Sequence, residues 1–186
     1  MTKVSNTKYY TFTGKVQWAK VYTPDEFRGA VRWGLDLYMD SDKEWAKFKE
    51  SGIQKKVKEN DAGKGFNLTR STTKVMKGKM VYFTPPQIVD KDGKVLVKYV
   101  DDQGKDVRSY EDKDKKITRV GDPVMIGNGS TIEVNVSVYP TAMGPGNRLE
   151  SIKLIDLIHY EKPEIAEEDK EQPSSEKVLG DSLPPW

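Results

Sequence analysis

Apolar and polar residues alternate with a period of two along three stretches of the chain, residues 10–18, 31–39 and 132–139. Successive side chains of a β-strand point to opposite faces, so each stretch predicts a strand with one buried face. A fourth stretch, 149–159, is apolar on both faces in its second half, which predicts a central strand. Weaker strands are predicted at 65–70, 79–84, 94–100 and 117–120.

One amphipathic helix is predicted over residues 42–60. Ser41 and Glu44 have the spacing of a capping box, in which the serine side chain accepts a hydrogen bond from a backbone N–H and the glutamate reaches back to the serine N–H. Trp45 and Phe48 follow as an apolar stripe. Residues 61–65, which contain two glycines, predict a mobile loop after the helix.

The predicted strands outnumber the predicted helices and fit residues 1–160 as one mainly β domain. A short sheet removes its reactive edges when it closes into a barrel. We therefore expect a five-stranded barrel with one or two helices and extended hairpins.

The composition changes near residue 160. Residues 163–186 carry seven acidic and two basic side chains, four prolines and few aliphatic residues. Such a segment buries too little apolar area to offset the entropy of ordering, so residues 161–186 are predicted to form a disordered tail. That segment has a net charge of −5 and the whole chain +2, which leaves +7 on the remaining residues. This asymmetry indicates a polyanionic partner, although a solvated lysine-rich surface gives the same charge.

Several kinds of chemistry are excluded or disfavoured by absent residues. The chain has no cysteine, which rules out disulfides, cysteine-ligated zinc and a cysteine nucleophile. His159 is the single histidine and lies in an apolar stretch, where a structural role is the simpler interpretation. No Walker A motif, signal peptide or membrane-spanning run is found, so we expect a soluble, cytoplasmic protein without a cofactor.

Acidic residues leave one enzymatic alternative open. Asp101, Asp102, Asp112 and Asp114 could hold a metal ion in a nuclease. Carboxylates among so many lysines more often belong to solvated turns, so we expect no catalytic residue.

Rings with neighbouring cations occur in several places. Single-stranded nucleic acid needs both, because cations follow the phosphates and exposed rings stack on the bases. The loop around Phe66 is the best single candidate, and Tyr139 lies on the polar face of its strand. Trp33 shares a face with Val31 and Leu35, which favours core packing over stacking. The predicted DNA-binding residues are Lys15, Trp18, Arg28, Arg32, Trp33, Lys64, Phe66, Arg70, Lys74, Lys77, Lys79, Tyr82, Tyr139 and Arg148.

Residues 123–157 contain a specific pattern. An Ile-Gly-x-Gly-Ser turn at 126–130 precedes an alternating strand that ends at Pro140, and an Arg-Leu-x-Ser-x-x-Leu strand begins at Arg148. This arrangement resembles the single-stranded DNA-binding proteins that phages encode for their own replication. The resemblance covers most of residues 1–160 and implies an OB-fold barrel, a DNA groove lined by cations and rings, frequent dimers, and a location in the cytoplasm of an infected host cell.

The end of the sequence adds to the resemblance. Proteins of that family end in an acidic tail with an aromatic tip, usually Phe, where this chain has Trp186. The resemblance implies that the tail recruits replication proteins such as a polymerase, helicase or primase. The residues expected to bind them are Asp181, Leu183, Pro184, Pro185 and Trp186.

The sequence therefore predicts a protein that binds single-stranded DNA without sequence preference, for phage DNA replication, recombination and repair. Two alternatives remain at this point. One is the metal-dependent nuclease, and the other is an OB-type module that binds RNA or double-stranded DNA, because every nucleic acid presents phosphates to the same cations.

Overall fold

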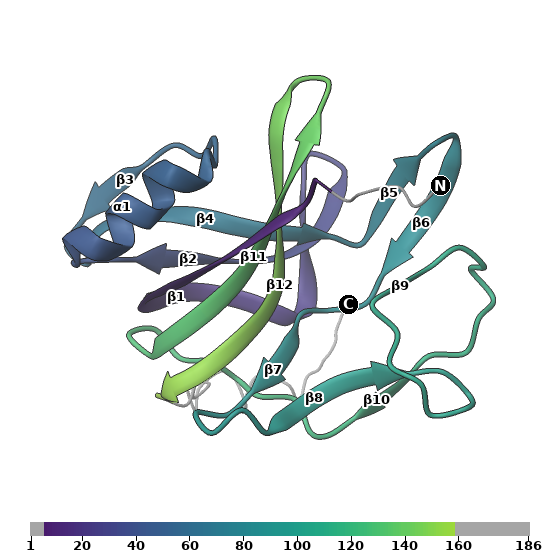
Figure 1. Ribbon diagram of the computed structural model, residues 1–186. Coiled ribbons are helices and arrows are strands. Elements are labelled where there is room, and N and C mark those ends of the chain that lie inside the picture. The colour runs from purple at the N-terminus through teal and green to yellow at the C-terminus, as the bar shows by residue number, and fades with distance from the viewer. Residues whose placement is uncertain (1–5, 159–186) are drawn as a thin grey trace, which may run out of the picture.

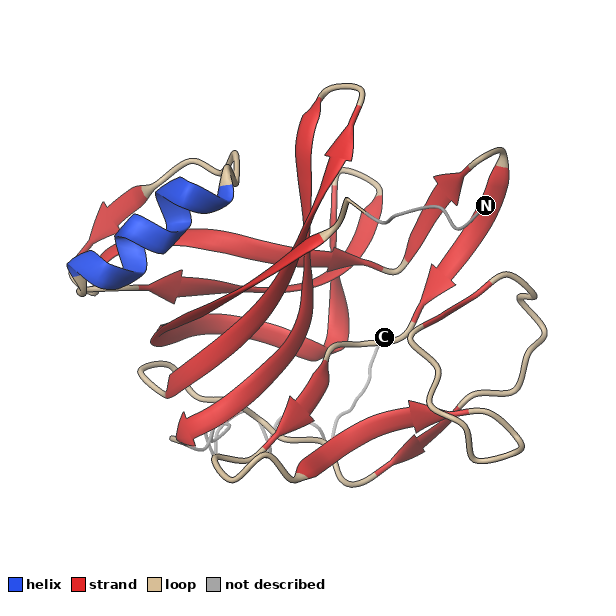
Figure 2. Cartoon of the chain, viewed as in Figure 1, coloured by secondary structure: helices blue, strands red, loops and turns tan. Residues whose placement is uncertain are grey.

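The computed structural model describes residues 6–158, which form twelve strands and one helix (Figure 1, Figure 2). The predicted tail and His159 lie outside the described residues. Among residues 6–158, no helix has the length and apolar character needed to cross a membrane. The elements are β1 (Lys8–Phe27), β2 (Ala30–Tyr38), α1 (Asp42–Ser51), β3 (Lys58–Asn60), β4 (Gly63–Ser71), β5 (Thr73–Met76), β6 (Lys79–Phe83), β7 (Gln87–Val89), β8 (Val95–Val100), β9 (Ser109–Tyr110), β10 (Thr118–Val120), β11 (Thr131–Thr141) and β12 (Gly144–Asp156).

Five strands form the barrel. They lie in the order β4-β2-β1-β11-β12 and pair antiparallel, and β12 packs against β4 on the remaining side. Numbered along the chain, their spatial order is 3-2-1-4-5 with the fifth strand beside the third, which makes a Greek-key barrel of the OB type. The structure thus confirms the predicted mainly β, OB-like fold. Each predicted strand corresponds to an observed one, because half-buried strands must alternate in polarity.

The barrel interior is filled by the apolar side of each alternating strand. Phe12 and Phe66 are fully buried and meet edge to face, with 5.8 Å between their ring centroids. The helix covers this end of the barrel with Phe48, whose ring centroid lies 4.5 Å from that of Phe66, and with Trp45. This aromatic cluster contributes apolar burial together with the additional stability of edge-on ring contacts.

The helix is shorter than predicted, because it ends at Ser51 and residues 58–60 form β3. Gly52 takes the left-handed conformation (φ 77°) and its N–H bonds to the Lys49 carbonyl, which stops the helix.

The predicted capping box is also wrong. Ser41 makes no side-chain capping bond, and the Glu44 carboxylate instead accepts the Thr13 N–H at 2.6 Å. Glu44 therefore ties the helix to β1.

The predicted mobile loop at 61–65 is a hairpin between β3 and β4. Gly65 pairs with Tyr38 and is buried beneath its ring. A Cβ at this position would lie 2.5 Å from the Leu37 carbonyl oxygen and 2.7 Å from the Tyr38 ring. The glycine is needed because two strands approach closely, and not because the backbone is free.

Strands β5 to β10 are inserted between the third and fourth barrel strands. β7 lies parallel to β12 and carries β8 and β10, and with β3 at the other edge these strands extend the barrel sheet to nine. β5, β6 and β9 form a separate three-stranded sheet. The β5–β6 hairpin and the long β11–β12 hairpin both extend from the same side of the molecule (Figure 1).

A buried arginine joins β4 to β12. The Arg70 side chain is 1% exposed and donates through Nε to the Thr84 carbonyl at 2.7 Å. Its Nη1 donates to the Leu149 carbonyl and to Glu150 Oε1, at 3.2 and 3.0 Å. Its Nη2 donates to the Arg108 carbonyl at 3.0 Å. Burial lowers the pKa of Arg70 to about 10, so the guanidinium stays charged at neutral pH and all these acceptors keep their partner.

We expect Arg70→Met to lower the free energy of unfolding by about 3–5 kcal/mol, because it removes the buried donor that three backbone carbonyls and the Glu150 carboxylate share. Chemical denaturation measures this loss. Arg119→Ala is the control, since Arg119 is exposed, and it should cost less than about 1 kcal/mol. Equal stabilities for the two variants would contradict the closing role of Arg70.

Candidate nucleic-acid interface

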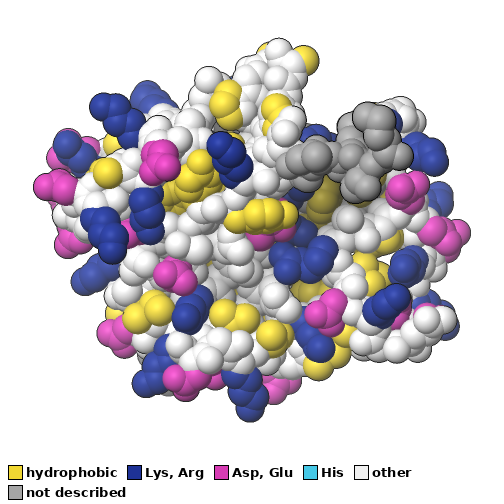
Figure 3. Space-filling view, viewed as in Figure 1, with side chains coloured by type: hydrophobic (Ala, Val, Ile, Leu, Met, Phe, Trp, Pro, Cys, Tyr) yellow, Lys and Arg dark blue, Asp and Glu magenta, His cyan; other side chains and the backbone are white. Residues whose placement is uncertain are grey.

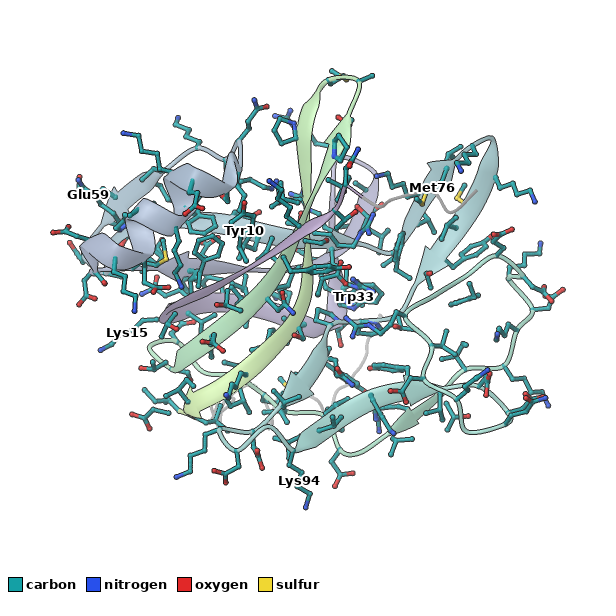
Figure 4. The ribbon with its side chains drawn as sticks, in the orientation of Figure 1. Tyr10, Lys15, Trp33, Glu59, Met76 and Lys94 are labelled. Atoms are coloured by element: carbon teal, nitrogen blue, oxygen red, sulfur yellow. The ribbon has the colours of Figure 1, made fainter. Side chains whose placement is uncertain are left out.

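A groove lies between the β5–β6 and β11–β12 hairpins, and we call it the hairpin groove. Its volume is about 670 Å³. Lys74, Met76 and Lys77 line it from the first hairpin, and Tyr139 and Arg148 from the second. Met76 lies near the end of β5 (Figure 4), and basic side chains and apolar patches lie next to each other over the centre of this face (Figure 3). The groove thus combines the two side-chain types that single-stranded nucleic acid requires.

Cations and rings alternate from the barrel interior to this groove. The Arg70 guanidinium carbon lies 5.3 Å from the Phe83 ring centroid, and that of Arg148 lies 4.4 Å from Phe83 and 5.0 Å from Tyr139. Lys74 Nζ completes the series 4.5 Å from the Tyr139 ring centroid. We call this series the cation–ring column. It holds Arg148 between two rings and so fixes the direction in which its charge faces the groove.

Glu150 lines the groove, and two arginines neutralise its charge. Glu150 Oε1 pairs with Arg70 Nη1 at 3.0 Å and with Arg108 Nη2 at 3.4 Å, and Glu150 Oε2 accepts the Ser137 hydroxyl at 2.6 Å. With its charge shared between two arginines, Glu150 does not repel an anion in the groove. Arg148, Lys74 and Lys77 then leave the lining positively charged.

The groove continues into a second hollow of about 720 Å³ on the other side of Met76 and Lys77. Lys79, Tyr110 and Lys115 line it, together with Glu111 and Asp112. Nearby, Tyr82 and Tyr110 stack with centroids 5.4 Å apart. The acidic residues make this hollow less basic than the hairpin groove.

Six of the predicted residues therefore lie in or beside one continuous surface. These are Lys74, Lys77, Lys79, Tyr82, Tyr139 and Arg148. Sequence reasoning missed Phe83, which contacts Arg148, Arg108, which pairs with Glu150, and Tyr110, which stacks on Tyr82. The inserted strands create these contacts, so they have no local sequence pattern.

Two predicted residues form a separate group. Trp18 and Arg32 line a hollow of about 220 Å³ on the outer side of β2 and β4, beside Lys20. Trp18 is 65% exposed and its backbone has φ 55°. The backbone N–H of Trp18 donates to Asn128 Oδ1 at 2.8 Å. Trp18 is thus a ring that a strained backbone holds in solvent.

Three predicted cations lie outside the hairpin groove. Lys15 borders a hollow that it shares with Asp40 and Glu44, far from Met76 in Figure 4. Arg28 lies in the β1–β2 turn with φ 52°, and Lys64 lies on the β3–β4 hairpin. All three side chains are exposed.

Three further predictions are corrected by burial. Phe66 is fully buried in the aromatic cluster, so it presents no face to a base. Arg70 closes the barrel and has no solvent-facing charge for a phosphate. Trp33 is 6% exposed, in agreement with the core alternative and not with stacking.

The acidic residues considered for a nuclease lie in turns. Asp101 Oδ1 accepts the N–H groups of Gln103 and Lys105, both at 2.9 Å. The bond from Lys105, with smaller effects of nearby groups, lowers the pKa of Asp101. Within residues 6–158 no three acidic or histidine side chains are grouped closely enough to hold a metal ion.

Comparison with known proteins gives similarity at the level of structure. No protein-family model matches the chain, and no curated protein matches it. The crystal structure of gp2.5, a single-stranded DNA-binding protein encoded by bacteriophage T7, matches with a TM-score of 0.53 and 16% identity, over 93% of this chain and 98% of that one. Two structures of the single-stranded DNA-binding protein from bacteriophage Enc34 have lower TM-scores.

One Enc34 structure has a TM-score of 0.45 and 11% identity, with coverage of 92% of this chain and 97% of that one. The C-terminally truncated form has a TM-score of 0.42 and 10% identity, with coverage of 88% and 95%. The T7 protein is a phage single-stranded DNA-binding protein, the kind of protein that the pattern at 123–157 resembles. The chain has the fold of T7 gp2.5.

Proposed function

We propose that this protein binds single-stranded DNA in the hairpin groove without sequence preference and serves phage DNA replication and recombination. The observation that carries the proposal is the cation–ring column, which brings Arg148, Tyr139 and Lys74 to one groove. The fold shared with T7 gp2.5, a single-stranded DNA-binding protein, supports it.

The proposed mechanism uses two independent interactions. Lys74, Lys77 and Arg148 neutralise phosphates, and the displaced counterions make the affinity depend on salt. In the complex a base takes the place of the Lys74 ammonium on the Tyr139 ring, and this stacking contributes about 1–3 kcal/mol and does not depend on base identity. Neither phosphate contacts nor stacking depends on base identity, so we infer binding to any sequence.

The tail supplies a second proposed function. We infer that residues 161–186, which lie outside the described residues, recruit replication proteins through Trp186 and nearby acidic side chains. The same segment is a tethered polyanion, so its effective concentration near the basic groove is high. It would therefore compete with DNA as well as bind partners.

Replacing two groove lysines should weaken binding and reduce its salt dependence. For Lys74→Ala with Lys77→Ala we expect the slope of log affinity against log salt to become shallower by about 1.4, since each phosphate contact to a single strand contributes about 0.7. Fluorescence anisotropy of labelled oligo(dT) measures this slope. Lys91→Ala with Lys94→Ala removes the same charge from the exposed β7–β8 turn and should leave the slope unchanged. Equal slopes in both double variants would refute the proposed site.

The stacking contribution is tested separately at Tyr139. Tyr139→Ala should weaken oligo(dT) binding about tenfold or more, because a ring-to-base contact is lost, whereas Tyr139→Phe keeps the ring and should bind nearly as wild type. Competition by duplex DNA and by RNA at the same salt concentration measures the preference for a single DNA strand. A Phe variant as weak as the Ala variant would argue against stacking.

Deleting residues 163–186 should tighten binding to oligo(dT), because it removes a net charge of −5 that competes for the groove. The gain should shrink as salt rises, since the competition is electrostatic. Titrations of the full chain and the truncated chain at low and high salt measure both effects. Unchanged or weaker binding by the truncated chain would contradict the competition.

A further inference from the structure

The tip of the β11–β12 hairpin presents an apolar side chain to solvent. Ala142 and Met143 connect the two strands, and Met143 is 94% exposed, the highest exposure of any large apolar residue within residues 6–158. Two-residue hairpin turns favour pairs such as Asn-Gly or Asp-Gly, and any polar residue would avoid exposing apolar area. Neither turn propensity nor packing in the described chain therefore accounts for a methionine here.

This tip is held rigidly. Thr141 Oγ1 accepts the Met143 N–H at 3.2 Å and donates to the Gly144 carbonyl, which closes the turn. Pro140 and Pro145 face each other one residue further down, and each has a fixed φ. On the outer side Gln54 packs on Gly144, where an added Cβ would lie 3.1 Å from Gln54 Oε1. The hairpin thus presents Met143 in a defined position.

Met143 also lies at the end of the hairpin groove. Tyr139, Pro140 and Thr141 line the groove along β11, and Met143 is two residues beyond Thr141. Met143 lies in the two-residue turn where the chain reverses, and its N–H bonds to Thr141 Oγ1 at 3.2 Å, so it is next to the residues that line the groove. A DNA strand that lies along the groove against Tyr139 would reach Met143 with its next nucleotides.

We propose that Met143 is a wedge that inserts between bases at the end of the groove and unpairs the duplex adjoining a bound single strand. Apolar side chains such as methionine unstack base steps in other DNA-binding proteins, where the gain in protein contacts offsets the unstacking. The inference rests on the proposed function, because the groove supplies the DNA. It assigns the opening of a single-strand to double-strand junction to one residue, in addition to the phosphate and base contacts of the groove.

A tailed DNA hairpin tests the wedge. It carries an oligo(dT) extension and 2-aminopurine in the first base pair of the junction, and its fluorescence rises when that pair opens. We expect the wild-type protein to open the pair, and Met143→Ala to need about tenfold more protein for half-maximal opening. Met143→Leu should act as wild type, because it keeps the apolar bulk. Met125→Ala removes an exposed methionine that does not line the groove and should change nothing.

Binding to plain oligo(dT), measured in parallel, separates the two proposals. Failure of the wild-type protein to bind oligo(dT) would overturn the proposed function. If oligo(dT) is bound but wild type and Met143→Ala open the junction equally, or neither opens it, only the wedge is overturned. An equal loss of oligo(dT) binding and of opening in Met143→Ala would also overturn it, since Met143 would then be an ordinary contact.

Discussion

The buried Arg70 is the interaction on which the rest of the structure depends. A guanidinium offers five donors in a rigid plane, and this one satisfies carbonyls on three segments together with the Glu150 carboxylate. It takes the place of a continuous backbone ladder between β4 and β12. Because a charge in this position is tolerated only when every partner is in place, the contact fixes the register of the barrel closure.

The same arginine connects the barrel to the surface. Arg70 contacts Phe83 on one side of the ring, and Arg148 lies against Phe83 within the cation–ring column. Glu150 is shared between Arg70 and Arg108. The orientation of the groove side chains is thus set by a network whose base lies in the core, which pre-organises the charges before any ligand arrives.

The pattern of apolar and polar residues was sufficient to predict the barrel strands, because alternation marks the half-buried strands and residues 149–159 are apolar on both faces. It also contained the signal that Phe66 is internal, because Phe66, Leu68 and Arg70 share one face of β4. Arg70 obscured this signal, because an arginine on one face of a strand normally indicates that the face is exposed, and a fully buried guanidinium is rare. The groove could not be predicted in the same way. Lys74 and Tyr139 are 65 positions apart, and only the inserted strands bring them together.

The sequence separation of the Arg70 contacts has a consequence for biosynthesis. Its carboxylate partner lies 80 positions later in the chain, so β4 has a bare edge and an unmatched guanidinium while the inserted strands are still being made. Almost the whole domain must therefore be synthesised before the barrel can close. Contacts between residues so far apart in sequence form slowly. During that interval the nascent chain would be most exposed to pairing with a neighbour on the same polysome.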